Sequence, residues 1–208
     1  MKIKVCGMKD PDNIRQVAEL PIQYMGFIFY EKSLRYIGTS FPVDLSFPDF
    51  LRRVGVFVNA SEKEILEKVR QFGLTTVQLH GSENPELALS LKRKHLEVFK
   101  VFSIAGKADL QKTALYEDCC DYFLFDTKTP LHGGSGKSFD WSALSEYKGN
   151  RPFFLSGGIG PEDTERLQQF RHPQWAGIDL NSKFEQSPGY KDAAMISAFI
   201  NQIRQFNF

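Results

Sequence analysis

The sequence has few cysteines, no surplus of either charge and no long apolar run. It holds 3 cysteines in 208 residues, and 26 Lys and Arg residues balance 25 Asp and Glu residues to a formal net charge of +1. Cys119 and Cys120 are neighbours that do not easily bridge each other, and Cys6 lies far from both, so a disulfide framework is not expected. The histidines are scattered and no Cys-x-x-Cys pair occurs, so we expect no metal site.

The charge balance and the short apolar runs also limit the partners. No basic excess is available to neutralise phosphates, which argues against nucleic-acid binding. The longest apolar stretches, Phe27–Tyr30 and Tyr122–Phe125, are far shorter than the roughly 20 residues that cross a bilayer. The first residues reach a polar segment without the apolar core of a signal peptide. We therefore expect a cytoplasmic protein, with residues 1–208 forming one domain and with no membrane partner.

Short apolar runs recur along the whole chain. Several are apolar throughout and rich in Val, Ile and Phe, as strands buried in a parallel sheet are. There are eight of them: Ile3–Cys6, Met25–Phe29, Val54–Val58, Thr76–Leu79, Val98–Phe102, Tyr122–Phe125, Phe153–Leu155 and Gly177–Leu180.

Residues that start helices stand between these runs. Ser61 and Glu64 have the spacing of a capping box. The other expected caps precede either a proline or a stretch with helical periodicity: Asp10, Asn84, Asp140, Gly160 and Asp192. Met195 belongs to the apolar stripe expected on the last helix. The weakest expectation is the helix before the third strand, because Pro42 and Pro48 interrupt it.

Eight strand–helix units without a break in composition predict an α/β fold, a (β/α)8 TIM barrel. A doubly wound open sheet is the alternative. That fold usually has fewer strands, so two of the eight runs would then be loops.

In a parallel barrel, the residues that follow the strands collect at one face, where such folds carry their chemistry. Here they would bring together one thiol, two carboxylates, one arginine and several other polar groups: Cys6, Arg35, Gln78, His80, Asp126, Asp179, Asn181 and Ser182. Arg35 suits a carboxylate clamp, with a solvated surface arginine as the alternative. His80 fits a site-lining group and a supporting histidine equally well.

The last two loops predict an anion site. Gly157 and Gly158 precede a helix start, where backbone N–H groups and the helix dipole favour phosphate, and Asn181 and Ser182 follow the neighbouring strand. An ordinary glycine-rich turn is the alternative. The segment 133–138 resembles the end of a P-loop, but Leu131 stands where the first glycine is required, so it is better interpreted as a flexible loop over the site.

Two residues are candidate acid–base groups. Cys6 ends the first strand, and Lys4 lies two residues earlier on the same face, where its charge would favour a thiolate. A core thiol is the alternative. Asp126 follows four apolar residues, and burial there would favour a proton-donating carboxyl. A structural acid that binds loop N–H groups is the alternative.

With these residues assembled, the sequence closely resembles the phosphoribosylanthranilate isomerase family. The similar segments follow one another along nearly the whole chain: residues 4–8, 26–29, 33–36, 55–59, 78–81, 125–127, 133–136, 139–141, 155–159, 177–182 and 188–192. Lys183 and Phe184 depart from the pattern, since the family more often has Gly-Val there.

The resemblance implies a (β/α)8 enzyme of tryptophan biosynthesis that needs no cofactor. Its reaction would be the Amadori rearrangement of N-(5'-phosphoribosyl)anthranilate to 1-(2-carboxyphenylamino)-1-deoxyribulose 5-phosphate. Asp126 would be the general acid, Cys6 the general base, and Arg35 the group that holds the anthranilate carboxylate. Gly157, Gly158, Asn181 and Ser182 would hold the phosphate. From their places at strand ends, we also expect Gln78, His80 and Asp179 in the substrate-binding set.

Two other functions remain as alternatives. A pentulose-phosphate epimerase on the same barrel would require a metal held by His and Asp at several strand ends, whereas only His80 ends a strand. A barrel that binds a phosphorylated ligand without converting it would need neither Cys6 nor Asp126. We expect a small phosphorylated substrate and a monomer or a weak homodimer. Phe206 and Phe208 fit either an interface or packing of the last helix onto the first strand.

Overall fold

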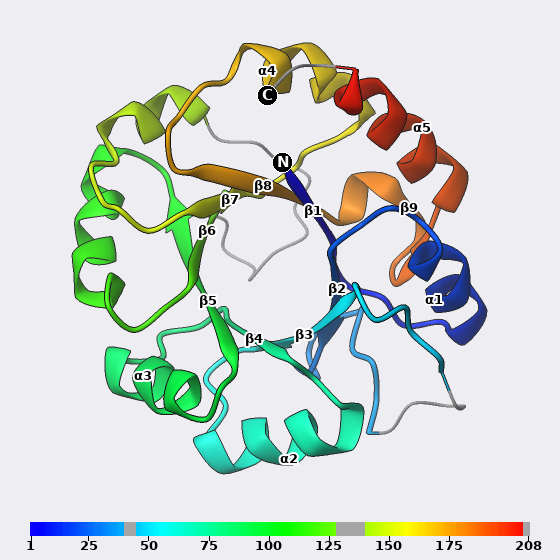
Figure 1. The fold of residues 1–208 in the computed structure, drawn as a ribbon, viewed down its shortest axis with the longest axis horizontal. Coiled ribbons are helices and arrows are strands. Elements are labelled where there is room, and N and C mark those ends of the chain that lie inside the picture. Colours follow the sequence, from blue (N-terminus) through cyan, green and yellow to red (C-terminus); the bar gives the residue numbers. More distant parts are fainter. Residues whose placement is uncertain (40–44, 128–139, 206–208) are drawn as a thin grey trace.

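Eight parallel strands close into a barrel in chain order, with β8 hydrogen-bonded to β1 (Figure 1). The computed structural model describes residues 1–39, 45–127 and 140–205. The strands are β1 Lys2–Val5, β2 Tyr24–Ile28, β3 Arg52–Phe57, β4 Thr76–Leu79, β5 Glu97–Ile104, β6 Tyr122–Thr127, β7 Phe153–Leu155 and β8 Trp175–Leu180. The expected (β/α)8 barrel is therefore confirmed, and the open sheet is wrong because the ring is closed.

Helices surround the ring of strands (Figure 1). The α-helices are α1 Pro11–Ala18, α2 Glu62–Phe72, α3 Pro85–Arg93, α4 Thr164–Gln169 and α5 Ala193–Arg204. Four 3-10 helices complete the set: η1 Lys107–Tyr116, η2 Trp141–Glu146, η3 Pro161–Asp163 and η4 Ser182–Phe184. A two-stranded hairpin, β9 Glu185–Ser187 and β10 Tyr190–Lys191, lies between η4 and α5. No helix in the described ranges is both long enough and apolar enough to span a membrane.

The helix caps expected from the sequence are largely confirmed. The Asp10 side chain accepts a hydrogen bond from the backbone N–H of Asn13 at 2.9 Å. Ser61 and Glu64 form the complete capping box of α2. Asn84 caps α3 and Asp192 caps α5 in the same way as Asp10. Each cap satisfies an N–H group that the first turn of a helix leaves unpaired.

The structure differs from the expected helices at four points. Residues 29–39 and 45–51, the described part of the segment between β2 and β3, contain no helix, in line with the two prolines there. Asp140 caps a 3-10 helix, and the helix after Gly160 begins as the 3-10 turn η3 and continues for only one and a half turns as α4. Met195 is exposed rather than part of the apolar stripe. Pro42, the segment 133–138, Phe206 and Phe208 lie outside the described residues.

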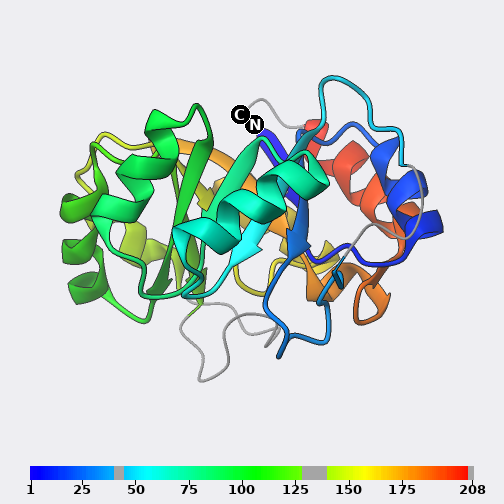
Figure 2. The same cartoon turned by 90° about the horizontal axis from the view of Figure 1, so that it is seen from below.

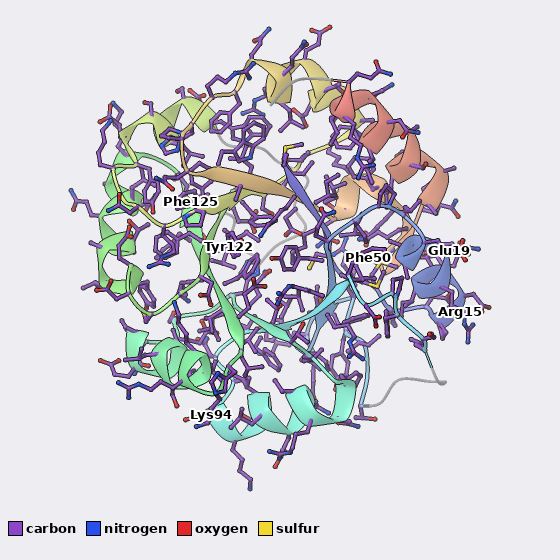
Figure 3. The ribbon with its side chains drawn as sticks, viewed as in Figure 1. Arg15, Glu19, Phe50, Lys94, Tyr122 and Phe125 are labelled. Atoms are coloured by element: carbon purple, nitrogen blue, oxygen red, sulfur yellow. The ribbon has the colours of Figure 1, made fainter. Side chains whose placement is uncertain are left out.

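Aromatic and aliphatic side chains fill the barrel interior towards the amino ends of the strands. The ring of Phe99 lies 5.3 Å from Tyr24 and 5.2 Å from Phe154, between centroids. Tyr122 also packs here, whereas Phe125 on the same strand points out towards the surrounding helices (Figure 3). This end of the lumen is therefore filled, and barrels of this kind bind their ligands at the carboxyl ends of the strands.

An irregularity in β8 sets the direction of its last side chains. The pairing of β7 with β8 runs from Phe153 opposite Trp175 to Phe154 opposite Gly177, so one extra residue, Ala176, is inserted. A β-carbon at Gly177 would lie 2.6 Å from the Phe154 ring, which shows that Gly177 faces the packed lumen. Two residues further on, Asp179 therefore also faces inward, opposite Lys4 of β1.

Candidate active site

The polar residues predicted to lie at the strand ends do meet at one end of the barrel. Figure 2 shows that the residues directly after β2 and the hairpin after β8 lie at this same end, away from the amino terminus. Cys6 follows β1, and Asp126 is the fifth residue of β6, three strands away around the ring. Both residues are buried, with Cys6 3% exposed and Asp126 7% exposed, and both side chains can take part in proton transfer.

Cys6 is fixed by the backbone on both sides. Its N–H donates to the Leu180 carbonyl at 2.9 Å, which extends the pairing of β1 with β8. The next two N–H groups, of Gly7 and Met8, both donate to the carbonyl of Gly26 on β2. The turn after β1 is therefore held between its two neighbouring strands, and the thiol has a defined position.

Lys4 affects Cys6 in the predicted direction, but burial outweighs it. Burial raises the pKa of the Cys6 thiol, while the Lys4 ammonium acts the other way without reversing the shift. Lys4 is itself fully buried and donates to Asp179 Oδ1 at 2.8 Å. Burial alone would lower the pKa of Lys4, yet the Asp179 carboxylate and the Cys6 side chain hold it above its usual value. The site therefore pairs a charged lysine with a neutral thiol, rather than with the preformed thiolate that the sequence predicted.

The surroundings of Asp126 fit both roles that the sequence left open, a structural acid that binds loop N–H groups and a proton-donating carboxyl. Its Oδ1 accepts a hydrogen bond from the backbone N–H of Thr127 at 2.8 Å, as a structural acid would. Its Oδ2 lies 3.5 Å from Nε2 of His80, at the end of β4. The other ring nitrogen of His80 lies 3.3 Å from Nε2 of Gln78. If the Gln78 amide donates there, His80 carries its proton on Nε2 and presents it to Asp126.

Gln78 leaves one strong acceptor unused inside the site. Its side chain is 1% exposed, and its Oε1 is buried with no hydrogen-bond partner among the described residues. A buried amide oxygen without a donor is costly, so its retention suits a group that accepts a hydrogen bond from a bound ligand.

The glycine-rich loop after β7 lies directly against Asp126. A β-carbon at Gly157 would fall 2.8 Å from Asp126 Oδ1 and 2.6 Å from the Thr127 nitrogen. Gly157 and Gly158 have φ values of +85° and +71°, a conformation that glycine adopts without strain. The loop thus brings backbone close to the acid, although the α-helix that follows it is too short to supply much of the expected dipole.

Arg35 and Asn181 both pack against Gly7, the residue after Cys6. A β-carbon at Gly7, whose φ is +79°, would lie 2.7 Å from Arg35 Cδ and 2.9 Å from Asn181 Oδ1. The predicted carboxylate clamp and the predicted phosphate loop therefore both reach the turn that carries the thiol. Asp179, two residues before Asn181, forms an ion pair with Lys4, and the Ser156 hydroxyl lies 3.3 Å from its Oδ2.

Comparison with known proteins identifies the family. Residues 3–202 match the family model described as "N-(5'phosphoribosyl)anthranilate (PRA) isomerase". The chain belongs to this isomerase family. The N-(5'-phosphoribosyl)anthranilate isomerase of Phocaeicola vulgatus is 52% identical over 205 residues, covering 99% of this chain and 98% of that protein. The corresponding protein of Parabacteroides distasonis is 50% identical over 207 residues, covering 98% of this chain and 93% of that protein.

Solved structures of phosphoribosylanthranilate isomerases have the same fold. The enzyme from Thermotoga maritima aligns over 99% of this chain and 100% of its own, with a TM-score of 0.83 and 34% identity. A further isomerase structure, with a TM-score of 0.82 and 30% identity over 99% of this chain and 100% of its own, holds reduced 1-(o-carboxyphenylamino)-1-deoxyribulose 5-phosphate. The family and the barrel expected from the sequence are thus confirmed.

The departure from the family pattern at Lys183 and Phe184 lies in η4, directly after Ser182. Phe184 is fully buried, with its ring 5.0 Å from that of Phe199 on α5. Lys183 is exposed and its Nζ lies 3.2 Å from Glu162 Oε1 of η3. The larger side chains are therefore accommodated, one in the core and one in a surface ion pair beside the glycine-rich loop.

Sequence reasoning missed several residues that build the site. Gly26 was noted only as part of a family segment, although it lies against Cys6. Glu185 and Lys191 hold Arg35 and Asn181 from the hairpin. Lys100 donates to Glu83 at 2.8 Å, and Glu83 accepts the N–H of Gly81 next to His80. A lysine within the apolar run 98–102 was the one available signal for this last pair, since a buried lysine requires a partner.

Among the described residues, no group of three or more His, Cys, Asp or Glu side chains is placed to hold a metal ion.

Proposed function

We propose that this chain catalyses the isomerisation of N-(5'-phosphoribosyl)anthranilate to 1-(2-carboxyphenylamino)-1-deoxyribulose 5-phosphate, with Asp126 as general acid and Cys6 as general base. The observation that carries the proposal is the placement of a buried thiol and a buried carboxylate on different strands at one barrel mouth, in a chain of this isomerase family. The two groups would act on different atoms of one sugar.

The acid step opens the ring. Asp126, protonated for this step, gives its proton to the furanose ring oxygen, and the bond between that oxygen and C1 breaks. The nitrogen lone pair then forms a C1=N iminium, while Asp126 becomes a carboxylate. His80, 3.5 Å from Asp126 Oδ2, and the Thr127 N–H, 2.8 Å from Oδ1, stabilise that carboxylate as it forms.

The base step moves the proton from C2. Cys6 first loses its thiol proton to solvent. The resulting thiolate takes the C2 proton, the C–H electron pair becomes the C1=C2 double bond, and the iminium nitrogen recovers its lone pair. The resulting enolamine tautomerises to the ketone by proton transfer to C1. The iminium acidifies the C2 proton, and a thiol whose pKa is raised by burial is the stronger base once it has ionised.

The two ends of the substrate would be held by two different groups of residues at the mouth. Arg35 offers a guanidinium to the anthranilate carboxylate, which it can bind with two parallel hydrogen bonds. Gly157, Gly158, Asn181 and Ser182 offer loop N–H and side-chain groups to the phosphate. The unpartnered Oε1 of Gln78 would accept a hydrogen bond from a sugar hydroxyl. Anchoring both ends orients the reacting carbons between acid and base.

The decisive experiment is an anthranilate-fluorescence assay in which the substrate is generated in situ and the protein has been stripped of metal. Rapid turnover would support the isomerase and argue against a metal-dependent epimerase. Tight binding of the product without turnover would leave a binding barrel as the function. No binding of the product would overturn the proposal.

We also propose that the enzyme works in the cytoplasm as one barrel domain, either as a monomer or as a weak homodimer. One solved structure from Thermotoga maritima is described as that of monomers of a dimeric phosphoribosylanthranilate isomerase. Light scattering over a range of protein concentrations distinguishes the two states.

A further inference from the structure

Two buried charges in the β9–β10 hairpin have no part in the proton transfers. The side chain of Glu185 is 4% exposed and that of Lys191 is fully buried, and the two form an ion pair at 2.6 Å. Burying an isolated charge is unfavourable, and even a buried ion pair often adds little to the stability of a protein. A buried pair therefore suggests a role beyond stability. The contacts of each partner show what this pair holds.

Glu185 grips one edge of the Arg35 guanidinium. Arg35 Nε donates to Oε1 at 2.8 Å, and Nη2 donates to Oε2 at 2.6 Å. This fork fixes the plane of the guanidinium. It uses the Nε–Nη2 edge, so the end of the guanidinium formed by Nη1 and Nη2 is the edge that a second carboxylate would meet.

Lys191 contacts Asn181, a residue of the proposed phosphate site. Its Nζ donates to Asn181 Oδ1 at 2.7 Å, in addition to its bond with Glu185. The Asn181 side chain is thereby oriented with its amide oxygen towards Lys191 and its NH2 group directed away. An NH2 group is the part of asparagine that can donate to a phosphate.

The hairpin that carries the pair is itself anchored in the core. The buried side chain of Asn13 on α1 accepts from the Lys191 N–H at 2.7 Å and donates to the Lys191 carbonyl at 2.8 Å. Figure 1 shows α1 beside this hairpin. The N–H of Gly189, which has a φ of +89°, donates to Glu185 Oε1 at 3.1 Å. The pair is therefore a rigid support, and not a pair of mobile surface side chains.

The charges of Arg35, Lys191 and Glu185 sum to a net positive charge, which favours binding of an anionic ligand. Arg35 and Lys191 carry two positive charges against the single negative charge of Glu185. The surplus lies beside the turn after β1, because Arg35 and Asn181 both contact Gly7. The Lys191 ammonium also lowers the pKa of Cys6, although less than burial raises it.

We propose that Glu185 and Lys191 are positioning residues that set, respectively, the carboxylate-binding edge of Arg35 and the phosphate-binding amide of Asn181. The inference rests on the proposed function, since it assigns the two ends of that substrate to the two members of one ion pair. Neither residue touches the reacting carbons. They act through substrate affinity and orientation.

The test compares ligands with and without the carboxylate. Glu185→Gln keeps the size of the side chain but weakens the fork, so KM should rise about tenfold or more while kcat changes far less. Its affinity for the reduced product should fall, and its affinity for the same compound lacking the ring carboxylate should not. Lys191→Met should weaken the binding of both ligands to a similar extent, because both ligands carry the phosphate. Lys191→Arg should recover part of the loss.

Glu146→Gln is the matched control, because Glu146 of η2 forms an exposed ion pair with Lys107 of η1, and neither 3-10 helix belongs to the hairpin. Equal loss of both ligands in Glu185→Gln, or unchanged KM in both variants, would overturn the inference. If Glu185→Gln does not fold, Lys191→Met carries the test: a change in kcat without loss of ligand affinity would contradict it. If the wild-type protein binds the reduced product but does not convert the substrate, the proposed function is wrong. The binding of the two ligands to the Glu185 and Lys191 variants would still test the positioning roles.

Discussion

Gly26 lies so close to Cys6 that a β-carbon at position 26 would fall 2.7 Å from the Cys6 sulfur and 3.1 Å from its α-carbon. Real β-carbons essentially never approach another atom to 2.7 Å, and the 3.1 Å approach to the Cys6 backbone is tighter than nearly all real β-carbon contacts. The absence of a side chain on β2 is therefore what makes room for the thiol on β1. Glycine within a strand commonly marks such a close approach.

Gly26→Ala should reduce kcat by roughly tenfold to a hundredfold, because a shift of the base by a fraction of an ångström disturbs its alignment with C2. The measurement is steady-state turnover, together with thermal unfolding to show that the variant is folded. Gly106→Ala is the control, since a β-carbon there meets nothing within 4 Å and its φ of −171° is open to any residue. Wild-type kcat in Gly26→Ala would show that the contact is unimportant for catalysis.

Cys6→Ser and Asp126→Asn should each lose about a hundredfold or more in turnover and still bind the reduced product in the micromolar range. Serine is too weak an acid to supply the base, and asparagine cannot donate the carboxyl proton. Both substitutions preserve shape, so ligand affinity measured by calorimetry should survive. A variant whose kcat stays near that of the wild type would remove that residue from its assigned role.

Lys4→Met should raise the pKa of Cys6 further, because it removes a cation that lowers it and leaves the Asp179 carboxylate, which raises it. The rise of activity with pH should therefore move to more alkaline values. The thiolate absorbance of Cys6 can be titrated in a background of Cys119→Ala and Cys120→Ala, so that no other thiol contributes. The double variant Lys4→Met, Asp179→Asn removes both charges, so the pKa of Cys6 should shift less in it than in Lys4→Met alone. An unchanged Cys6 pKa in Lys4→Met would mean that the lysine has no influence on the base.

The barrel could be predicted from the sequence because its strands are buried on both faces. Such strands are short apolar runs with clear ends, and two of them, Thr76–Leu79 and Phe153–Leu155, were predicted with the observed bounds. Once the topology is known, the residue after each run has to lie at the barrel mouth. This is why Cys6 and Asp126 could be placed at the site without any contact information.

The supporting contacts could not be predicted, because their partners are far apart in the sequence. The Lys4–Asp179 pair spans 175 positions and the Arg35–Glu185 fork spans 150. The β9–β10 hairpin is short and polar, so no periodicity indicates it. The 3-10 helices were missed for a related reason: in a short segment, i to i+3 and i to i+4 bonding give nearly the same apolar pattern. Burial of the thiol, which reverses the expected net effect of Lys4, is a tertiary property as well.

Lys191 gives the protein a distinct dependence of stability on pH. Burial lowers its pKa from the usual 10.5 to about 8, although Glu185 acts in the opposite direction. Between these pH values, the unfolded chain holds a proton on Lys191 that the folded chain has released. The unfolding free energy must therefore rise with pH through this window, and the contribution is absent below it.

Wild-type protein should accordingly gain on the order of 3 kcal/mol relative to Lys191→Met as the pH rises from about 8 to 10.5. The measurement is urea unfolding of both proteins at several pH values across this window, so that groups common to both cancel. Lys148→Met is the control, because Lys148 is exposed and its loss should leave the pH dependence of the wild type unchanged. Parallel stability curves for wild type and Lys191→Met would show that Lys191 keeps its proton throughout, and that Glu185 compensates fully for the burial of its charge.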